Sequence, residues 1–471
     1  MRRHRVKNIY MSVAYLVCLG VLAACSPKEA PQPVARGRVI RVIMPISKDE
    51  AVLISANDLK TDHHDYLELI KADGRRVWQT TVDDFQAYEL RNVCPLVAND
   101  AHIFVVGKNT RNDYLVLALA RADGREVWRH ALPRSDWPSR PESTLTSDSE
   151  RLVVVYRSLE QPPSEYPDEY GVVNRIIGLD SATGARIWPL GEPEAIVGRD
   201  NVNITTTIPG RLLVTRHAFL REEDVEYPTF ELDTATGETL RRMSPIFAPY
   251  RTPIGILGYD NDITLFSSTT PNSNKPQVLV TLSSERSMAL DWPMGIFNNL
   301  AILGFDIDED SGRNLLLMAI DIETGATRWA YKSERYISAT TFATTEGVFP
   351  RMLPIFARED NEKHAVAILD LATGIGKPLE TREGLFFDVI ATRDRTIVYD
   401  RDHGILYDYD GETGKQSRAP YEVGSSLSQI HADALRFGRL WCYDTDAKPT
   451  AEPAWTVIDI PTWKVLHQHG R

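Results

Sequence analysis

The stretch DIETGATRW, residues 321–329, decides the fold because its pattern recurs along the chain. Related stretches are DSATGARIW (180–188), DTATGETLR (233–241), DLATGIGKP (370–378) and DGETGKQSR (410–418), and two earlier copies read KADG (71–74) and RADG (121–124). The shared glycines are Gly74, Gly124, Gly184, Gly237, Gly325, Gly374 and Gly414, at steps of 50, 60, 53, 88, 49 and 40 residues. Self-similarity at such steps is the signature of a repeat protein.

Two further copies are degenerate. The step of 88 residues is nearly twice the others, which predicts a hidden copy at VTLSSERSMAL (280–290), with Ser283 to Arg286 in place of the turn. A ninth copy, DIPTWKVLH (459–467), has Trp463 at the glycine position. The period is then about 49 residues, and one repeat domain extends from residue 37 to 471.

Short apolar runs precede the turns, such as AHIFVVG (101–107), RLVVVY (151–156) and HAVAILD (364–370). Their length and their Val, Ile and Leu content predict strands that are buried on both faces. A period of this size holds four short strands, which is one propeller blade. We therefore predict an all-β fold, a β-propeller of four-stranded blades. Eight blades are expected, and seven or nine are the alternatives.

The repeated residues have structural explanations. Glycine adopts the positive φ that a tight hairpin needs, and an Asp four residues earlier can cap the turn. These aspartates are Asp180, Asp233, Asp321, Asp370 and Asp410. A Trp four residues after the glycine, as at Trp78, Trp128, Trp188 and Trp329, can pack on the neighbouring blade. We interpret the Asp residues as turn caps and the Trp residues as packing groups.

The N-terminus predicts export. A basic start and an apolar stretch over residues 1–24 have the form of a signal peptide, and LAAC (22–25) resembles a lipobox in which Cys25 is lipidated. Ser26 after the cysteine implies sorting to the outer membrane, as in Gram-negative lipoproteins. Residues 25–36 contain three prolines and are expected to form a tether.

Charge and cysteine content limit the function classes. Without residues 1–24 the chain keeps 49 basic and 65 acidic residues, a net charge of −16. Such a surface argues against general nucleic-acid binding. Cys94 and Cys442 remain after Cys25, either as a disulfide in an oxidising periplasm or as separate buried thiols.

The Asp-x-x-Thr-Gly-x-x-x-Trp pattern resembles the tryptophan-docking repeat of the pyrroloquinoline-quinone-like (PQQ-like) propellers, over residues from about 37 to 471. The first two copies depart from it with ADG in place of TG. The copies at Gly237, Gly374 and Gly414 lack the Trp.

Two classes of protein share this repeat. Quinoprotein dehydrogenases hold a quinone and Ca²⁺ on the propeller axis, often under adjacent cysteines, but this chain has no Cys-Cys pair and no haem motif. The BamB-like lipoproteins of the outer-membrane β-barrel assembly machinery bind partners and catalyse nothing. The lipobox, tether and bare propeller resemble this second class.

That resemblance implies a monomeric, non-catalytic scaffold without a cofactor. It implies lipid anchorage in the outer membrane, facing the periplasm, and protein partners in the envelope. The alternatives are a PQQ-dependent dehydrogenase, or another exported propeller such as an immunity or stress factor.

No catalytic, cofactor or metal residue is predicted. DIDEDSG (306–312) opens like an EF-hand loop, but Ser311 occupies the glycine position and Leu317 the place of the final Glu. DHHD (62–65) could approach His467 and His469 through ring closure, but regular zinc-ligand spacing is missing. Hydrolase elbows, P-loops and Rossmann glycine patterns do not occur in the sequence.

A partner surface is predicted on loops between the second and third strands of each blade. The loops 159–170, 220–227, 306–313 and 357–364 together carry 15 acidic and four basic residues. The first two loops also contribute aromatic residues, the usual interface anchors. The candidate partner-binding residues are Tyr166, Asp168, Glu169, Tyr170, Glu222, Glu223, Asp224 and Tyr227. The alternative is an ordinary solvated surface, because loop tips face water.

Overall fold

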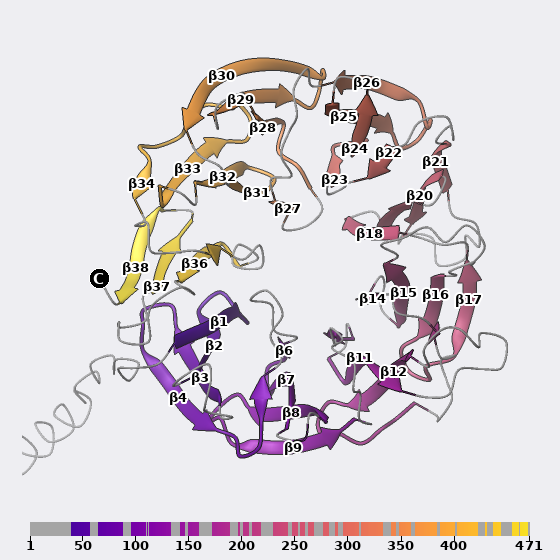
Figure 1. Cartoon of the computed structure of the whole chain (residues 1–471), viewed down its shortest axis with the longest axis vertical. Coiled ribbons are helices and arrows are strands. Elements are labelled where there is room, and N and C mark those ends of the chain that lie inside the picture. Colours follow the sequence, from indigo (N-terminus) through magenta and orange to yellow (C-terminus); the bar gives the residue numbers. More distant parts are fainter. Residues whose placement is uncertain are drawn as a thin grey trace, which may run out of the picture.

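The computed structural model describes residues 39–469 except 57–64, 88–95, 110, 112, 133–141, 147–148, 160–171, 189–195, 198–200, 207–209, 218–228, 244–246, 253–254, 260–261, 268–276, 282–287, 291–294, 310–311, 333–340, 345–347, 359–362, 384–386, 401–402, 423–428, 431–436, 444–454 and 461. Throughout these residues the regular structure consists of strands, and no helix there is long and apolar enough to cross a membrane. The sheets form a ring in which the C-terminal sheet lies beside the N-terminal one (Figure 1).

The first half of the ring contains sheets 1 to 4. Sheet 1 contains β1 (Val39–Pro45), β2 (Glu50–Ala56), β3 (Asp65–Lys71) and β4 (Arg76–Thr81). Sheet 2 contains β5 (Gln86–Ala87), β6 (Leu96–Ala98), β7 (His102–Lys108), β8 (Tyr114–Ala120) and β9 (Glu126–Ala131). Sheet 3 contains β10 (Glu142–Leu145), β11 (Arg151–Leu159), β12 (Val172–Asp180) and β13 (Ile196–Val197). Sheet 4 contains β14 (Asn201–Thr206), β15 (Arg211–His217), β16 (Thr229–Asp233) and β17 (Thr239–Met243).

The second half contains sheets 5 to 9. Sheet 5 contains β18 (Phe247–Thr252), β19 (Gly255–Tyr259), β20 (Asp262–Ser267) and β21 (Gln277–Thr281). Sheet 6 contains β22 (Met288–Leu290), β23 (Gly295–Phe297), β24 (Leu300–Glu309), β25 (Gly312–Asp321) and β26 (Thr327–Lys332), and sheet 7 contains β28 (Met352–Arg358), β29 (Lys363–Asp370) and β30 (Ile375–Glu383). Sheet 8 contains β27 (Thr341–Thr344), β31 (Phe387–Ala391), β32 (Arg395–Asp400), β33 (Ile405–Asp410) and β34 (Tyr421–Glu422). Sheet 9 contains β35 (Gln429–Ile430), β36 (Arg439–Tyr443), β37 (Trp455–Asp459) and β38 (Lys464–His469).

The predicted all-β propeller is confirmed, but the predicted number of eight blades is not. The described residues form nine sheets, and sheet 7 has three strands because β27 pairs in parallel with β31 of sheet 8. Pro354 in β28 supplies a physical reason. The Leu371 N–H donates to the carbonyl of Arg351, so Pro354, three residues further on, faces the opposite edge of β28. Proline has no N–H for an inner strand to accept there.

One of the two degenerate copies was predicted wrongly. β21 closes sheet 5, whereas the next strand, β22, pairs with β24 of sheet 6. The strands that flank Ser283 to Arg286 therefore belong to different sheets and form no hairpin. The ninth copy is confirmed, because Trp463 has φ of 58° and lies in the turn between β37 and β38.

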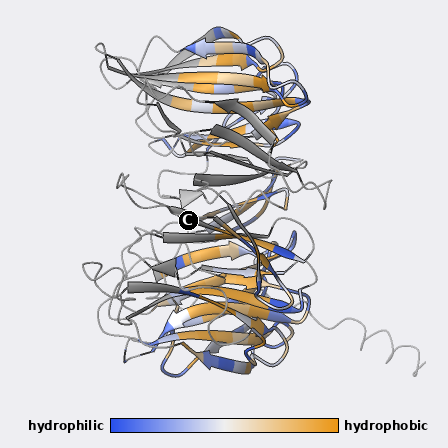
Figure 2. Cartoon of the chain, turned by 90° about the vertical axis from the view of Figure 1, so that its right-hand side faces the viewer, coloured by the Kyte–Doolittle hydropathy of each residue, from blue (hydrophilic) through white to orange (hydrophobic). Residues whose placement is uncertain are grey.

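The core lies between the sheets, as the non-alternating apolar runs predict. In β2 six of seven residues are buried, and β8 is equally covered. The outer strands differ, since in β4 and β9 the residue buried most completely on the strand is the Trp. Figure 2 shows the apolar residues in the middle of the strands and the hydrophilic ones toward their ends. Inner strands thus lose water on both faces, and outer strands on one.

The repeated turn is built as its residues predict. In sheet 3, Asp180 Oδ1 accepts hydrogen bonds from the Thr183 N–H at 2.8 Å and the Thr183 hydroxyl at 2.7 Å. Gly184 has φ of 70°, and its N–H donates to the Asp180 carbonyl at 2.8 Å. The same caps are present at Asp233, Asp321 and Asp410. The prediction that these aspartates cap turns is confirmed.

The predicted tryptophan docking is also confirmed. Each Trp covers the turn glycine of the next sheet: Trp78 covers Gly124, Trp128 covers Gly184, Trp188 covers Gly237 and Trp329 covers Gly374. Each indole N–H donates to the backbone carbonyl three residues before that glycine, at Arg121, Ser181, Thr234 and Leu371, over 2.9–3.2 Å. A Cβ on Gly184 would lie 2.5 Å from the Trp128 ring. Only glycine therefore fits this place.

We expect Gly184→Ala to destabilise the fold by about 3 kcal/mol, because the new methyl group meets Trp128 and the backbone keeps a positive φ. Thr183→Ala, in the same turn, removes one cap and should cost about 1 kcal/mol. Urea unfolding of both variants measures the difference. Equal losses of unfolding free energy in the two variants would show that the packing of Trp128 does not require a glycine at position 184.

Candidate functional site

The ring has two ends with different chemistry. The turns between first and second strands and between third and fourth strands lie at one end, which we call the turn face. The connections between second and third strands lie at the other end, which we call the loop face. This follows from antiparallel order, since successive connections alternate between the two ends of a sheet.

The predicted partner-binding residues lie outside the described residues, so only the strands that flank them can be placed. Tyr166, Asp168, Glu169 and Tyr170 fall between β11 and β12, and Glu222, Glu223, Asp224 and Tyr227 fall between β15 and β16. β11 and β12 pair over their whole length, from Arg151↔Asp180 to Leu159↔Val172. Both acidic segments thus connect second strands with third strands, as predicted.

The strands that carry these two acidic segments pack against each other. Val153 and Ile176 of sheet 3 share one core cluster with Leu212 and Phe230 of sheet 4. Trp188 closes this junction, since its N–H donates to the Thr234 carbonyl at 3.1 Å. The scaffold therefore places the ends of both acidic segments on neighbouring sheets. Their role in partner binding stays a prediction.

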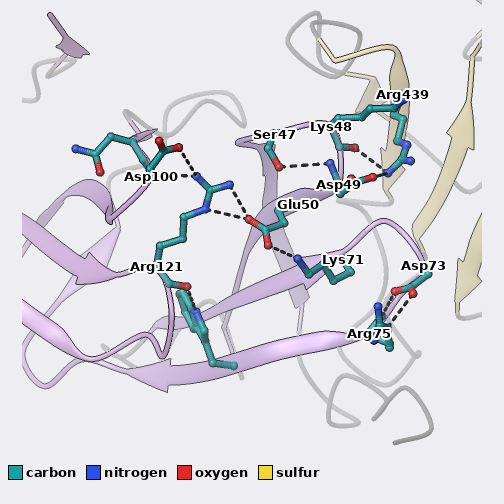
Figure 3. Close-up of polar contacts among 12 residues, drawn as sticks. Ser47, Lys48, Asp49, Glu50, Lys71, Asp73, Arg75, Asp100, Arg121 and Arg439 are labelled. Atoms are coloured by element: carbon teal, nitrogen blue, oxygen red, sulfur yellow. Dashed lines mark hydrogen bonds and ion pairs between the residues drawn. The ribbon is translucent and has the colours of Figure 1, made fainter. Parts of the chain in front are cut away.

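The turn face carries an ionic network between sheets 1 and 2 (Figure 3). Glu50 accepts hydrogen bonds from Lys71 of its own sheet and from Arg121 of sheet 2, at 2.7 and 3.0 Å for the two Arg121 nitrogens. Burial alone would raise the pKa of Glu50, but Lys71 and Arg121 hold it below its usual value. Arg121 also receives the Trp78 N–H on its carbonyl. This network stabilises a junction between sheets.

The turn aspartate Asp321 is unsuited to act as a general acid at neutral pH. Arg328 and the Thr324 N–H bind Asp321 and lower its pKa to about 2, so the group stays ionised at neutral pH. Asp408 of β33 behaves differently. Burial raises its pKa, although Arg395 and Arg418 lie 3.4 and 3.7 Å away. Asp408 is 2% exposed, and its neighbours tie β33 to the outer segment of sheet 8.

The two candidate metal motifs have structural roles where the chain is described. DIDEDSG lies on the hairpin of β24 and β25, in which Glu309 is opposite Gly312. In DHHD, Asp65 is buried and accepts hydrogen bonds from Arg41 at 2.8 Å and from the Ala87 N–H at 2.6 Å. Within the described residues no group of three potential ligands could hold a metal ion.

The structure describes Cys442, one of the two cysteines that remain after Cys25. Cys442 lies on β36 as a buried free thiol, and its pKa is raised because burial disfavours the thiolate. Cys94 and Cys25 lie outside the described residues. The alternative of a buried thiol therefore holds for Cys442.

Comparison with known proteins identifies the repeat. A family model described as "Outer membrane protein assembly factor BamB" matches residues 41–239, which include the turns at Gly74, Gly124, Gly184 and Gly237. The chain is a β-propeller that resembles the PQQ-like repeat family over residues 41–239. The same turn continues beyond the matched residues to Trp463, and the similarity to BamB is at the level of the family. No curated protein sequence matches the chain.

Solved structures give distant similarities. AztD from Citrobacter koseri is 10% identical with a TM-score of 0.41, over 82% of this chain and 94% of that one. A eukaryotic initiation factor is 10% identical with a TM-score of 0.48, over 86% and 93%. Quinohemoprotein alcohol dehydrogenase from Comamonas testosteroni is 12% identical with a TM-score of 0.32, over 83% and 74%. These values are too low to support an argument about this chain.

Sequence reasoning missed the residues that tie the sheets together on the turn face. In the sequence, Arg121 is recognisable only as the first residue of RADG. In the structure its guanidinium binds Glu50 and its carbonyl accepts the Trp78 N–H. A usable signal existed, because at all four junctions with a docking Trp the indole N–H donates to the carbonyl of the residue three before the turn glycine. Glu50 had no such signal, since its partners are 21 and 71 residues away.

Asp321 makes the stability of the fold depend on pH in a predictable direction. Its folded pKa of about 2 lies below the ordinary 3.8, so its contribution is present above about pH 4 and is lost as the pH falls toward 2. Asp321→Asn should reduce the unfolding free energy at pH 7 and leave it nearly unchanged near pH 2. Glu323→Gln, at the exposed neighbour in the turn, is the control. Urea unfolding across this pH range measures the difference in unfolding free energy between the variant and the wild type. A difference at pH 2 as large as that at pH 7 would contradict the assignment.

Proposed function

We propose that this propeller is a non-catalytic scaffold, anchored by a lipid on Cys25 to the outer membrane and facing the periplasm. Its partners are proteins of the cell envelope, and the process is outer-membrane protein assembly. The observation that carries the proposal is the match of residues 41–239 to the family described as outer membrane protein assembly factor BamB.

The chemistry of the repeat supports a scaffold. Asp and Trp side chains recur in the repeat units, and their contacts stabilise the fold. Asp180, Asp233 and Asp321 cap turns, and Trp78, Trp128 and Trp188 fill the junctions between sheets. A residue that recurs at each junction for packing carries no information about one catalytic centre. The function must then come from segments that differ between units.

The acidic loop-face segments differ in this way, and we assign partner binding to them. Residues 159–170 carry four acids and no base, and residues 220–227 carry four acids and one base. Fields of one sign steer association with an oppositely charged surface. The partner surface is therefore basic, with pockets for Tyr166, Tyr170 and Tyr227 as aromatic anchors.

The partner can be identified by photo-crosslinking in cells. A photoreactive amino acid replaces Tyr166 in one strain and Val77, an exposed residue on the outer strand β4, in a control strain. Crosslinking from position 166 to a component of the outer-membrane assembly machinery, without the same product from position 77, is the expected result. Stoichiometric binding of pyrroloquinoline quinone with Ca²⁺ to the purified protein would instead favour the dehydrogenase class.

Replacing Tyr166, Tyr170 and Tyr227 together by Ser should reduce partner recovery at least tenfold and leave the melting temperature unchanged, because hot-spot anchors contribute about 2 kcal/mol or more each. Reversing the acids in 159–170 should slow association most at low salt, where screening is weakest. Unchanged recovery from both variants would leave the loop face as ordinary solvated surface.

Cys25→Ser should release a folded propeller into the soluble periplasmic fraction. The expected tether 25–36 precedes the repeat in the sequence and contains three prolines, so we expect the propeller to fold without its anchor. Fractionation of cells with and without the substitution tests this. Retention in the membrane fraction would show that another feature anchors the protein.

A further inference from the structure

The ring has one junction without a covalent connection. Between any two consecutive sheets the chain itself leads from one to the next, but sheet 9 and sheet 1 contain the two ends of the repeat domain. Among the described residues no strand is shared across this closure, which we call the seam. β1 to β4 come from the N-terminal end and β35 to β38 from the C-terminal end. Side-chain contacts therefore hold the seam together.

At the seam the docking residue is His467, whose side chain is smaller than that of Trp. His467 follows Trp463 by four residues, the same step as from each turn glycine to its Trp, and it covers Gly74 of sheet 1. Its ring also packs on Trp455, with centroids 4.4 Å apart. Imidazole covers less apolar surface than indole. The docking contact of His467 therefore stabilises the seam less than the docking contact of a Trp stabilises each of the four Trp junctions.

Two buried indoles make the seam weaker still. Trp441, Trp455 and His467 share the face of sheet 9 that meets Gly74, because Trp441 and His467 both lie opposite Val457. Trp441 and Trp455 are stacked with centroids 6.0 Å apart and are at most 2% exposed. Their Nε1 atoms have no acceptor in the described part of the chain, whereas the four docking indoles each donate to a carbonyl. A buried unsatisfied donor costs free energy in the closed state.

Arg439 supplies a polar contact across the seam. Its guanidinium donates to the Lys48 carbonyl at 2.8 Å and forms an ion pair with Asp49, on the turn face (Figure 3). Asp49 is 65% exposed and Arg439 13%, so water and salt reach this ion pair from the side of Asp49 and weaken it. An apolar cluster joins Ile40 and Ile43 of β1 to Leu440 and Val457. In the described part of the chain, the seam is thus closed by apolar packing and by the contacts of Arg439 with Lys48 and Asp49.

We propose that the ring opens at this seam, by separation of sheet 9 from sheet 1, while the covalently linked junctions stay closed. In a repeat protein each unit contacts only its neighbours, so the weakest interface opens first. Opening gives the Trp441 and Trp455 N–H groups access to water or to carbonyl groups of a bound chain. This inference does not rest on the proposed function.

Hydrogen exchange of the full-length lipoprotein in detergent tests the proposal. Peptides that cover β1, the Gly74 turn and β36 to β38 should exchange together, about tenfold or more faster than peptides at the Trp128–Gly184 junction. His467→Trp restores the repeat residue and should slow exchange at the seam about tenfold, since one added indole contact is worth roughly that factor. Trp128→His is the matched control, and it should speed exchange in sheets 2 and 3 and leave the seam unchanged.

A crosslink keeps the test independent of His467. Asp49→Cys and Arg439→Cys, joined by a short bifunctional reagent, place a covalent link where the ion pair now lies. The linked protein should lose the fast exchange at the seam, and the unlinked double variant should exchange faster than the wild type. Seam exchange as slow as that at the Trp128–Gly184 junction, or fast exchange that survives the crosslink, would overturn the proposal.

Discussion

The fold depends on one contact, the indole of one sheet lying on the turn glycine of the next. The contact needs a positive φ at the glycine, space where a Cβ would stand, and a carbonyl three residues earlier to accept the indole N–H. Gly184 and Trp128 meet all three conditions. The hairpin of one sheet is thereby part of the packing of its neighbour. A repeat unit cannot complete its core alone, which is why the same nine-residue stretch recurs around the ring.

Junctions without a docking Trp show how the constraint is met by other means. Gly414 is covered by Ile368 and Met352 of sheet 7, so apolar side chains replace the indole. Trp463 occupies the glycine position itself and meets Tyr421 of sheet 8 edge-on, with centroids 6.4 Å apart. In sheet 8, Arg418 stands where the Trp is expected and lies 3.7 Å from the buried Asp408. The first two solutions place a large apolar group between neighbouring sheets, whereas Arg418 pairs with a carboxylate of its own sheet.

The sequence could predict what is local and repeated. Asp180, Thr183, Gly184 and Trp188 all lie within nine residues, so the turn and its cap follow from spacing alone. The break at β21 and β22 and the parallel pairing of β27 with β31 could not be predicted, because they depend on which distant strand is available as a partner. The same limit applies to Glu50 and Arg121, which are 71 residues apart. The candidate loop face was predicted from topology, since the connection that follows a second strand must lie opposite the turn.

The division of the ring into two faces has a physical basis. On the turn face, the Asp caps, glycines and indoles depend on one another, so a change in one turn disturbs the adjoining sheet. On the loop face, docking places no demand on the connection between second and third strands. This connection spans 160–171 between β11 and β12 but only 260–261 between β19 and β20. Loop closure becomes only slowly more costly with length. Acidic and aromatic residues can therefore vary on the loop face without weakening the junctions, and this freedom makes it the face on which recognition can develop.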